Sequence, residues 1–297
     1  MDIRDGGCEV MTTSMQAVND PAYTPSNWII TLTYNNLALT KAAINSFRSQ
    51  DIEGGVKVLV VDNGSSDNTR SWLHTQPDLT VIFSPVNSVA GGWNKGLRWL
   101  FESKWIEGKP VASNVEHVLV CNNDVLLRPD TYRWLVADGG RFVTAVGDDS
   151  ADCLVVPEGG FAEPLAKKRP HPDFSCYLIH KSTWKTVGEF DEQFKIAYCE
   201  DWDMHCRLHQ AGITAECIDL PFYHMGAATV NSASAAQQRK VRGQADLNRE
   251  AFQSKWGMAG GSPEYYDYFS HEAPTKAASD HDPLPARASD PNPSPSV

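Results

Sequence analysis

Asp124 is the residue whose type and position most suggest chemistry, because it lies in the sequence CNNDV at the end of the predicted strand 117–122. A single carboxylate at a strand end can bind Mg²⁺ or Mn²⁺ when phosphate oxygens complete the coordination shell. Asn122 and Asn123 could hold a sugar or ribose without adding charge. The alternative is a polar strand end that begins a turn, aided by Pro129. Taken alone, this stretch favours the turn, and a metal site there depends on the motifs that accompany it.

A second group of polar residues follows the apolar segment 56–62 in the sequence VVDNGSSDNT. Asp62 could accept hydrogen bonds from a base or ribose, Asn63 comes next, and Gly64 allows a tight backbone turn. A helix start follows, as in a nucleotide pocket, but an Asx-type turn that only caps that helix would have the same sequence. The apolar segment 28–34 likewise ends in polar residues, namely Tyr34 with Asn35 after it.

The glycine-rich segment 87–96, NSVAGGWNKG, is a third candidate for binding a ligand. It begins at Asn87, and glycines such as Gly92 allow a backbone to approach a ligand closely. Asn94 and Lys95 are expected to open a helix whose N-terminus favours anions. The spacing fits neither a Walker A loop nor G-x-G-x-x-G, so a plain turn is the alternative.

Three acids fall within four residues at the predicted start of a helix in the segment 198–212. At 3.6 residues per turn, Glu200 and Asp203 share one side of this helix and Asp201 points elsewhere. Acids at a helix N-terminus stay ionised, as a general base requires, although they also stabilise helices without any chemistry. His224 in PFYHMG is either a structural histidine or a second metal ligand.

The elements that must position these residues alternate between strand-like and helix-like segments. Such alternation predicts an α/β fold with a Rossmann-like, doubly wound, mostly parallel sheet flanked by helices. Ligands of such sheets bind beyond the carboxyl ends of the strands, where the candidate residues fall. The predicted strands are 28–34, 56–62, 79–84 and 117–122, and the predicted helices are 39–50, 65–75, 94–106 and 129–138.

Composition excludes several classes of protein. A net charge of −11 argues against a general affinity for nucleic acid or anionic membranes. Seven cysteines without a C-x-x-C pair indicate reduced thiols, and therefore a cytoplasmic protein without a zinc site. No apolar run reaches the roughly 18 residues of a membrane span, and the N-terminus lacks a signal-peptide pattern.

Taken in order, these stretches resemble the family 2 glycosyltransferases, inverting enzymes with the GT-A fold, from about Trp28 to His224. The matching stretches are TYNN, VVDNGSSDNT, VNSVAGGWNKGL, NNDV as a variant of the D-x-D metal motif, and GEFDEQF followed by CEDWDMHCRLHQAG. The resemblance implies a transferase that moves a sugar from a UDP-, dTDP- or GDP-linked donor to an acceptor hydroxyl. The acceptor would be a glycan or a lipid-linked glycan.

The resemblance also implies residue roles. Asp124, with His224, would hold Mn²⁺ or Mg²⁺, and Asp201, beside Glu200, would be the catalytic base. The nucleotide-sugar-binding residues would be Thr33, Tyr34, Asn35, Asp62, Asn63, Gly64, Asn87, Gly92, Asn94, Lys95, Asn122 and Asn123. Two departures from the family pattern affect these expectations. The metal motif keeps only its last acid, which predicts weak metal affinity in the absence of the donor. Ser175–Tyr177 stand where the family often has small residues, which predicts a narrower or differently shaped acceptor pocket.

The expected domain organisation is a flexible leader over residues 1–26, a GT-A catalytic domain over 27–262, and a disordered acidic, proline-rich tail over 263–297. Within the domain, residues 27–125 would form the nucleotide-sugar-binding half and residues 126–262 the acceptor-binding half.

Three other functions compete with this one. The basic clusters 166–171 and 237–249 would suit a DNA glycosyltransferase that modifies a hydroxymethylated base, although solvated helix faces explain them more simply. A non-catalytic nucleotide-sugar-binding module would keep the pocket and lose the base. A nucleotidyltransferase would need a glycine-rich pyrophosphate loop near the N-terminus, and TYNNLALTK lacks one.

Overall fold

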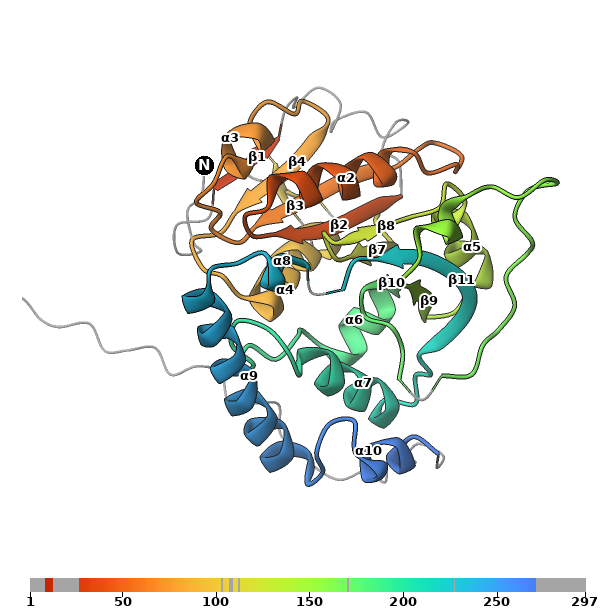
Figure 1. Cartoon of the computed structure of the whole chain (residues 1–297). Coiled ribbons are helices and arrows are strands. Elements are labelled where there is room, and N and C mark those ends of the chain that lie inside the picture. The colour runs from red at the N-terminus through yellow and green to blue at the C-terminus, as the bar shows by residue number, and fades with distance from the viewer. Residues whose placement is uncertain are drawn as a thin grey trace, which may run out of the picture.

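A mixed sheet forms the centre of the molecule in the computed structural model, which describes residues 9–12, 27–102, 104–106, 109–111, 113–169, 171–226 and 228–270. Within these residues, nine strands pair in the order β1-β4-β3-β2-β7-β10-β9-β11-β8 (Figure 1). The strands are β1 (Glu9–Thr12), β2 (Trp28–Thr33), β3 (Lys57–Asp62), β4 (Leu79–Phe83), β7 (His117–Cys121), β8 (Val125–Leu126), β9 (Phe142–Asp148), β10 (Cys176–His180) and β11 (Glu216–His224). Strands β5 (Lys104–Ile106) and β6 (Lys109–Val111) form a separate antiparallel pair.

The direction of the strands confirms the predicted doubly wound, mostly parallel sheet. Strand β2 lies parallel to both β3 and β7, β3 lies parallel to β4, and β9 lies parallel to β11. Strands β1, β8 and β10 are antiparallel to their neighbours. The chain builds outward from β2 through β3 to β4 and then returns to place β7 on the other side of β2. Ligands of doubly wound sheets bind at the carboxyl ends of strands at such a reversal.

Helices cover both faces of the sheet, which explains why β2 is buried along its whole length. Successive side chains of a strand point to opposite faces. Ile29 accordingly belongs to the same apolar cluster as Ile44 of α2, and Ile30 to the same cluster as Leu97 of α4. The helices are α2 (Leu37–Arg48), α3 (Thr69–Leu73), α4 (Val89–Phe101), α5 (Thr131–Asp138), α6 (Lys181–Val187), α7 (Glu200–Gln210), α8 (Ala228–Asn231), α9 (Ala235–Trp256) and α10 (Pro263–Tyr268), with the 3-10 helix η1 at Ala151–Leu154.

A third apolar cluster joins the last helices to α7. Cys206 of α7, Phe252 of α9 and Tyr265 of α10 are buried in it together with Phe194. Figure 1 shows α9 leading from α8, beside the sheet, to α10 at the far end. A capping box at Ser234 begins this long helix, and Gly257 ends it in the left-handed conformation.

The start of α4 was predicted wrongly. The helix was expected over 94–106, but it begins at Val89 because the Ser88 side chain accepts a hydrogen bond from the N–H of Gly91 and so caps the helix. The glycine-rich segment therefore forms the first turns of a helix. Asn94 and Lys95 lie within it and not at its anion-binding N-terminus.

Parts of the predicted leader and tail are structured. Residues 9–12 form β1, which pairs with β4, and residues 263–268 form α10, which buries the side chain of Tyr265. The predicted start of the disordered tail at residue 263 was therefore wrong, because aromatic side chains after this residue pack in the third apolar cluster. Residues 1–8, 13–26 and 271–297 lie outside the described residues. In the part of the chain that the structure describes, no helix is both long and apolar enough to cross a membrane.

Candidate active site

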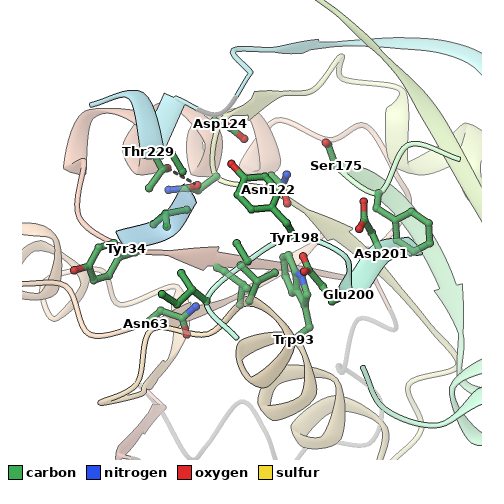
Figure 2. A pocket seen from close by; sticks show the side chains of 18 of the residues that line it. Tyr34, Asn63, Trp93, Asn122, Asp124, Ser175, Tyr198, Glu200, Asp201 and Thr229 are labelled. Atoms are coloured by element: carbon green, nitrogen blue, oxygen red, sulfur yellow. Dashed lines mark hydrogen bonds between the residues drawn. The ribbon is translucent and has the colours of Figure 1, made fainter. Parts of the chain in front are cut away.

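A cavity of about 1090 Å³ opens where strands β2, β3, β7 and β11 end. Ten of the predicted site residues line it, namely Thr33, Tyr34, Asn63, Asn87, Asn122, Asn123, Asp124, Glu200, Asp201 and His224. In Figure 2, Tyr34 and Asn63 lie on one side of the pocket and Asp201 on the other, with Asn122 and Asp124 between them. The carboxyl ends of the strands thus bring together residues that lie far apart in the sequence. The chemical roles of these residues stay predictions.

Asp62 and Asn35 do not line the cavity, although each shapes the loop beside it. Asp62 is fully buried, its Oδ1 accepts a hydrogen bond of 3.1 Å from the N–H of Ser65, and burial raises the pKa of its carboxyl. The Oδ1 of Asn35 accepts hydrogen bonds from the N–H groups of Ser66 and Asp67 at 2.7 and 3.2 Å. These contacts hold the turn that passes through Gly64, whose φ of +84° favours glycine.

Gly92 and Asn94 serve packing instead of lining the cavity. A Cβ atom at Gly92 would lie 2.8 Å from the Leu32 side chain and 2.9 Å from Oδ1 of Asn63, so glycine lets α4 approach the strand ends. The buried Asn94 donates to the carbonyl of Phe190 at 2.9 Å and accepts from its N–H at 2.8 Å. Asn94 lies in the second turn of α4, where its side chain points away from the cavity. Its hydrogen bonds therefore connect α4 to the segment that precedes α7. Lys95 does not line the cavity either.

Asp124 is nearly buried and has protein partners for both carboxylate oxygens. Its Oδ1 lies 3.5 Å from Nε2 of His224, and its Oδ2 accepts a hydrogen bond of 3.1 Å from the N–H of Ala228. The hydrogen bond to this carboxylate raises the pKa of His224 above its ordinary value. Neighbouring Asn123 pairs through Oδ1 with the hydroxyl of Thr229 at 3.3 Å. Helix α8 thus packs directly on the predicted metal-binding residues.

The residues at this position suit a divalent cation only when a ligand supplies further donors. Among the described residues, no group of three or more His, Cys, Asp or Glu side chains is arranged to hold a metal ion. Asp124 and His224 nevertheless offer one carboxylate oxygen and one imidazole nitrogen at adjacent positions, which Mn²⁺ accepts. Mg²⁺ and related ions commonly combine one or two carboxylates with phosphate oxygens. The pair therefore fits a metal ion that arrives with a diphosphate.

Glu200 and Asp201 form the other end of the cavity, at the first turn of α7. Burial, and secondarily the charge of Asp201, raise the pKa of Glu200 to about 8. The Oε2 atom of Glu200 is buried and has no partner among the described residues. Asp201 accepts a hydrogen bond of 2.9 Å from the N–H of Trp202 through Oδ1. Because Glu200 is protonated at neutral pH, Asp201 is the acid of this pair that can act as a base.

The pKa of Glu200 predicts a pH dependence of stability that the Glu200→Gln variant lacks. Because the folded state holds this proton more tightly than the unfolded state, the raised pKa of Glu200 contributes to the stability of the folded protein. The contribution is complete below the ordinary carboxyl pKa of 4.5, and it is lost as the pH rises to about 8. The free energy of unfolding should fall by up to about 1.4 kcal/mol per pH unit in this window. Urea denaturation at pH 5 and pH 8 measures the slope, and Glu250→Gln, at an exposed position of α9, is the control. Equal slopes for the wild type and the Glu200→Gln variant would contradict the assignment.

Asp203, the third acid of the motif, holds the structure together. It is fully buried and pairs with Arg207 at 2.8 Å and with Lys255 at 2.6 Å. Its Oδ1 also accepts a hydrogen bond of 3.0 Å from the indole of Trp256. Asp203 thus fastens α7 to α9, and it is not among the residues that line the cavity.

Sequence reasoning missed most of the cavity wall. Its aromatic residues are Trp93, Phe174, Tyr177, Phe190 and Tyr198, and its remaining charged or titratable residues include Arg169, His171, Asp173 and Lys240. Tyr177 lies in the segment Ser175–Tyr177 that was expected to shape the acceptor pocket, and Arg169, His171 and Lys240 lie in the two basic clusters, whereas no role had been predicted for the other residues named. Several side-chain atoms of cavity residues are buried without a partner among the described residues, namely Asn63 Oδ1, Asn123 Nδ2, His171 Nε2, Tyr177 Oη and Glu200 Oε2. The cavity thus combines apolar rings with polar atoms that can bind a polar ligand.

Comparisons with known proteins show which families and structures this chain is similar to. The pattern of the family "Glycosyl transferase family 2" matches residues 28–136. A mannosyltransferase of Pyrobaculum calidifontis, solved with GDP-Man and Mn²⁺, superposes with a TM-score of 0.51 at 19% identity, over 86% of this chain and 70% of that chain. This likeness confirms the GT-A fold. TarS residues 1–349 of S. aureus, solved with UDP, superpose with a TM-score of 0.45 at 18% identity, over 81% of this chain and 68% of that one. A search of curated protein sequences finds no match.

Proposed function

We propose that the chain, whose residues 28–136 match the pattern of the family "Glycosyl transferase family 2", is a glycosyltransferase. It would move a sugar from a nucleotide diphosphate sugar to an acceptor hydroxyl by a single inverting displacement. The observation that carries this proposal is that Asp124 and His224 lie in the same cavity as Glu200 and Asp201. The first pair suits a diphosphate with its metal ion, and the second pair suits proton transfer. A sugar between them would have its leaving group on one side and its attacking hydroxyl on the other.

Asp124 and His224 would hold Mn²⁺ or Mg²⁺, which would stabilise the negative charge of the departing diphosphate as a Lewis acid. In this structure the two carboxylate oxygens of Asp124 contact the N–H of Ala228 and the imidazole of His224, so these contacts would rearrange when a cation binds. Asn122 and Asn123, directly before Asp124, would contact the sugar or ribose with neutral amides. The nucleoside would lie toward Tyr34 and Asn63, at the ends of β2 and β3 (Figure 2).

Asp201 would take the proton of the acceptor hydroxyl as its oxygen attacks the anomeric carbon. Glu200 stays protonated beside it, because burial raises its pKa to about 8, and so does not compete for that proton. Asp124 lies between Asp201 and the residues Tyr34 and Asn63 (Figure 2), an order that supports attack from the face opposite the leaving group and hence inversion.

The acceptor would be a glycan or a lipid-linked glycan. Aromatic rings bind the apolar faces of sugars, and Trp93, Phe174 and Tyr198 line the same cavity as the acids. The six cysteines within the described residues are free thiols, which supports a cytoplasmic location.

Modified DNA is the second candidate acceptor, because Arg169 of one basic cluster and Lys240 of the other line the cavity. Lys167, two residues before Arg169 in the same cluster, is instead paired with Asp219 at 3.0 Å. Binding of hydroxymethylated DNA that weakens steeply with salt would favour DNA, and no such binding would favour the glycan.

A donor panel tests the proposed function. The protein would be incubated with GDP-, UDP- and dTDP-sugars and Mn²⁺, and the released nucleoside diphosphate would be measured with water as the acceptor. We expect slow hydrolysis of one donor, and we expect chelation of the metal to stop it. Hydrolysis of none of the donors, together with no binding of any nucleoside diphosphate, would overturn the proposal.

A further inference from the structure

The segment Lys195–Cys199, which leads into the acidic motif, has an unfavourable backbone conformation. Ile196, Tyr198 and Cys199 have φ values of 63°, 78° and 75°, in the left-handed region that residues with side chains avoid. For a β-branched residue such as Ile196 this conformation is a clear outlier. Such strain persists only where the surrounding structure holds it, and it gathers at functional sites.

One side chain from a distant helix holds this segment. Asn248 of α9 is buried, and its Nδ2 donates hydrogen bonds to the carbonyls of Lys195, Ala197 and Tyr198 at 2.9, 2.9 and 3.0 Å. Its Oδ1 accepts a hydrogen bond of 3.0 Å from Nε2 of Gln244, one turn earlier in α9, which orients the amide. An amide has two N–H bonds for these three carbonyls, so at least one is shared. No other amino acid of this length supplies both a double donor and an acceptor.

Residues 195–199 connect the start of α4 to the start of α7, and both helices contribute residues to the cavity wall. The carbonyl of Ile196 accepts a hydrogen bond of 2.8 Å from the N–H of Val89, the first residue of α4. The carbonyl of Cys199 accepts a hydrogen bond of 3.0 Å from the N–H of Asp203 in the first turn of α7. The backbone of Glu200 and that of Tyr198 lower the pKa of the Glu200 carboxyl, against the larger effect of burial. A shift of this segment would therefore move the acids as well.

We propose that Asn248 is a positioning residue, which holds Tyr198, Glu200 and Asp201 where proton transfer from the acceptor requires them. The proposal rests on the proposed function, because it assigns Asp201 the role of base. Asn248 itself does not line the cavity, so it acts through the backbone that it binds. Figure 2 shows the side chains of Tyr198, Glu200 and Asp201 gathered around the pocket that this segment borders.

Removing the Asn248 amide should loosen the segment without detaching α9. Lys255 of the same helix bridges Asp191 at 2.7 Å and Asp203 at 2.6 Å. Phe252 packs on Phe194, directly before the segment, with ring centroids 6.5 Å apart. These contacts lie on both sides of residues 195–199 and do not involve Asn248. A substitution at Asn248 thus tests the position of the segment and not the presence of the helix.

The test compares Asn248→Asp with Gln253→Glu, which makes the same change from amide to acid at an exposed position of α9. An aspartate cannot donate to the three carbonyls and repels them. With the sugar nucleotide that the donor panel selects, we expect hydrolysis by Asn248→Asp to fall roughly 10- to 100-fold, because small displacements of reacting groups cost about this much. The Kd of the matching nucleoside diphosphate should stay within about threefold, since the catalytic step and not donor affinity is affected. Gln253→Glu should match the wild type in both measurements.

Hydrogen exchange of the amides of residues 195–203 gives a readout that does not depend on activity. We expect faster exchange there in Asn248→Asp, with α9 unchanged, and Asn248→Ala serves if the aspartate variant does not fold. Wild-type hydrolysis by both Asn248 variants, or equal losses of turnover and nucleotide affinity, would overturn the positioning role. Absence of turnover by the wild type with every donor would overturn the proposed function instead. In that case, unchanged hydrogen exchange in the Asn248 variants would still show that Asn248 does not fix the conformation of residues 195–199.

Discussion

Asp201→Asn is expected to lower the rate of sugar transfer roughly 10²- to 10⁴-fold, the usual contribution of a general base. The amide keeps the shape of the side chain and an oxygen for the N–H of Trp202, but it cannot take a proton. Asp201 lies on a different side of the cavity from Tyr34 and Asn63 (Figure 2), so the affinity for nucleoside diphosphate should not change. Turnover with the selected donor and calorimetric titration of the matching nucleoside diphosphate measure the two quantities.

Asp246→Asn is the matched control for this prediction. Asp246 is exposed on α9. Among the described residues its one ion pair is with Arg249 at 2.6 Å, and such surface pairs contribute little. The control should keep both the rate and the affinity of the wild type. Full turnover by Asp201→Asn would remove it as the base, and Glu200 and Asp173, which also line the cavity, would then be the remaining candidates.

Asp124→Asn should also reduce turnover, by roughly 10²- to 10⁴-fold, through loss of metal binding. A Lewis acid on a leaving diphosphate supplies several kcal/mol, and each 1.36 kcal/mol is a factor of ten in rate. Asp124 carries the only carboxylate in the CNNDV stretch, so no neighbour there can replace it. In contrast to the loss at Asp201, this loss should be accompanied by weaker binding of nucleoside diphosphate in the presence of Mn²⁺.

Asp152→Asn is a suitable control, because Asp152 is exposed in η1 and does not line the cavity. The metal dependence is measured by titrating Mn²⁺ against the rate of hydrolysis for each protein. A rate that neither the Asp124→Asn variant nor a chelator changes would show that the reaction does not use a metal at this position.

The strand ends could be predicted because parallel strands buried on both faces are nearly continuous apolar runs. Strand β2 is fully buried, and five of the six residues of β3 are buried, so the polar residues after them stand out. Their convergence follows from the topology alone, since carboxyl ends of parallel strands meet at one edge. This explains why most of the predicted residues on β2, β3 and β7 line one cavity.

The function of Asn94 could not be predicted, because it depends on where α4 begins. A glycine pair looked like a loop, but Ser88 caps the helix before it and the glycines permit close packing on Leu32. Lys95 was misassigned for the same reason. Local composition does not distinguish a glycine that approaches a ligand from one that approaches another element.

The acceptor side of the cavity was the least predictable part. The spacing of the acidic motif placed Glu200 with Asp203, but Asp203 pairs with Arg207 and Lys255 whereas Glu200 lines the cavity. The hold of Asn248 on residues 195–199 spans about 50 positions of sequence. No periodicity or motif signals such a contact, because it arises only when α9 packs across the segment before α7.

The measurement that tests the central claim most directly is electron paramagnetic resonance of Mn²⁺ with the full chain and the nucleoside diphosphate of the selected donor. Asp124, with His224, is assigned to the metal, and Asp201 to the proton. The expected result is bound Mn²⁺ in the wild type and in Asp201→Asn, only when the nucleotide is present, and free Mn²⁺ in Asp124→Asn. Bound Mn²⁺ in Asp124→Asn, or its loss in Asp201→Asn, would contradict this division of the cavity.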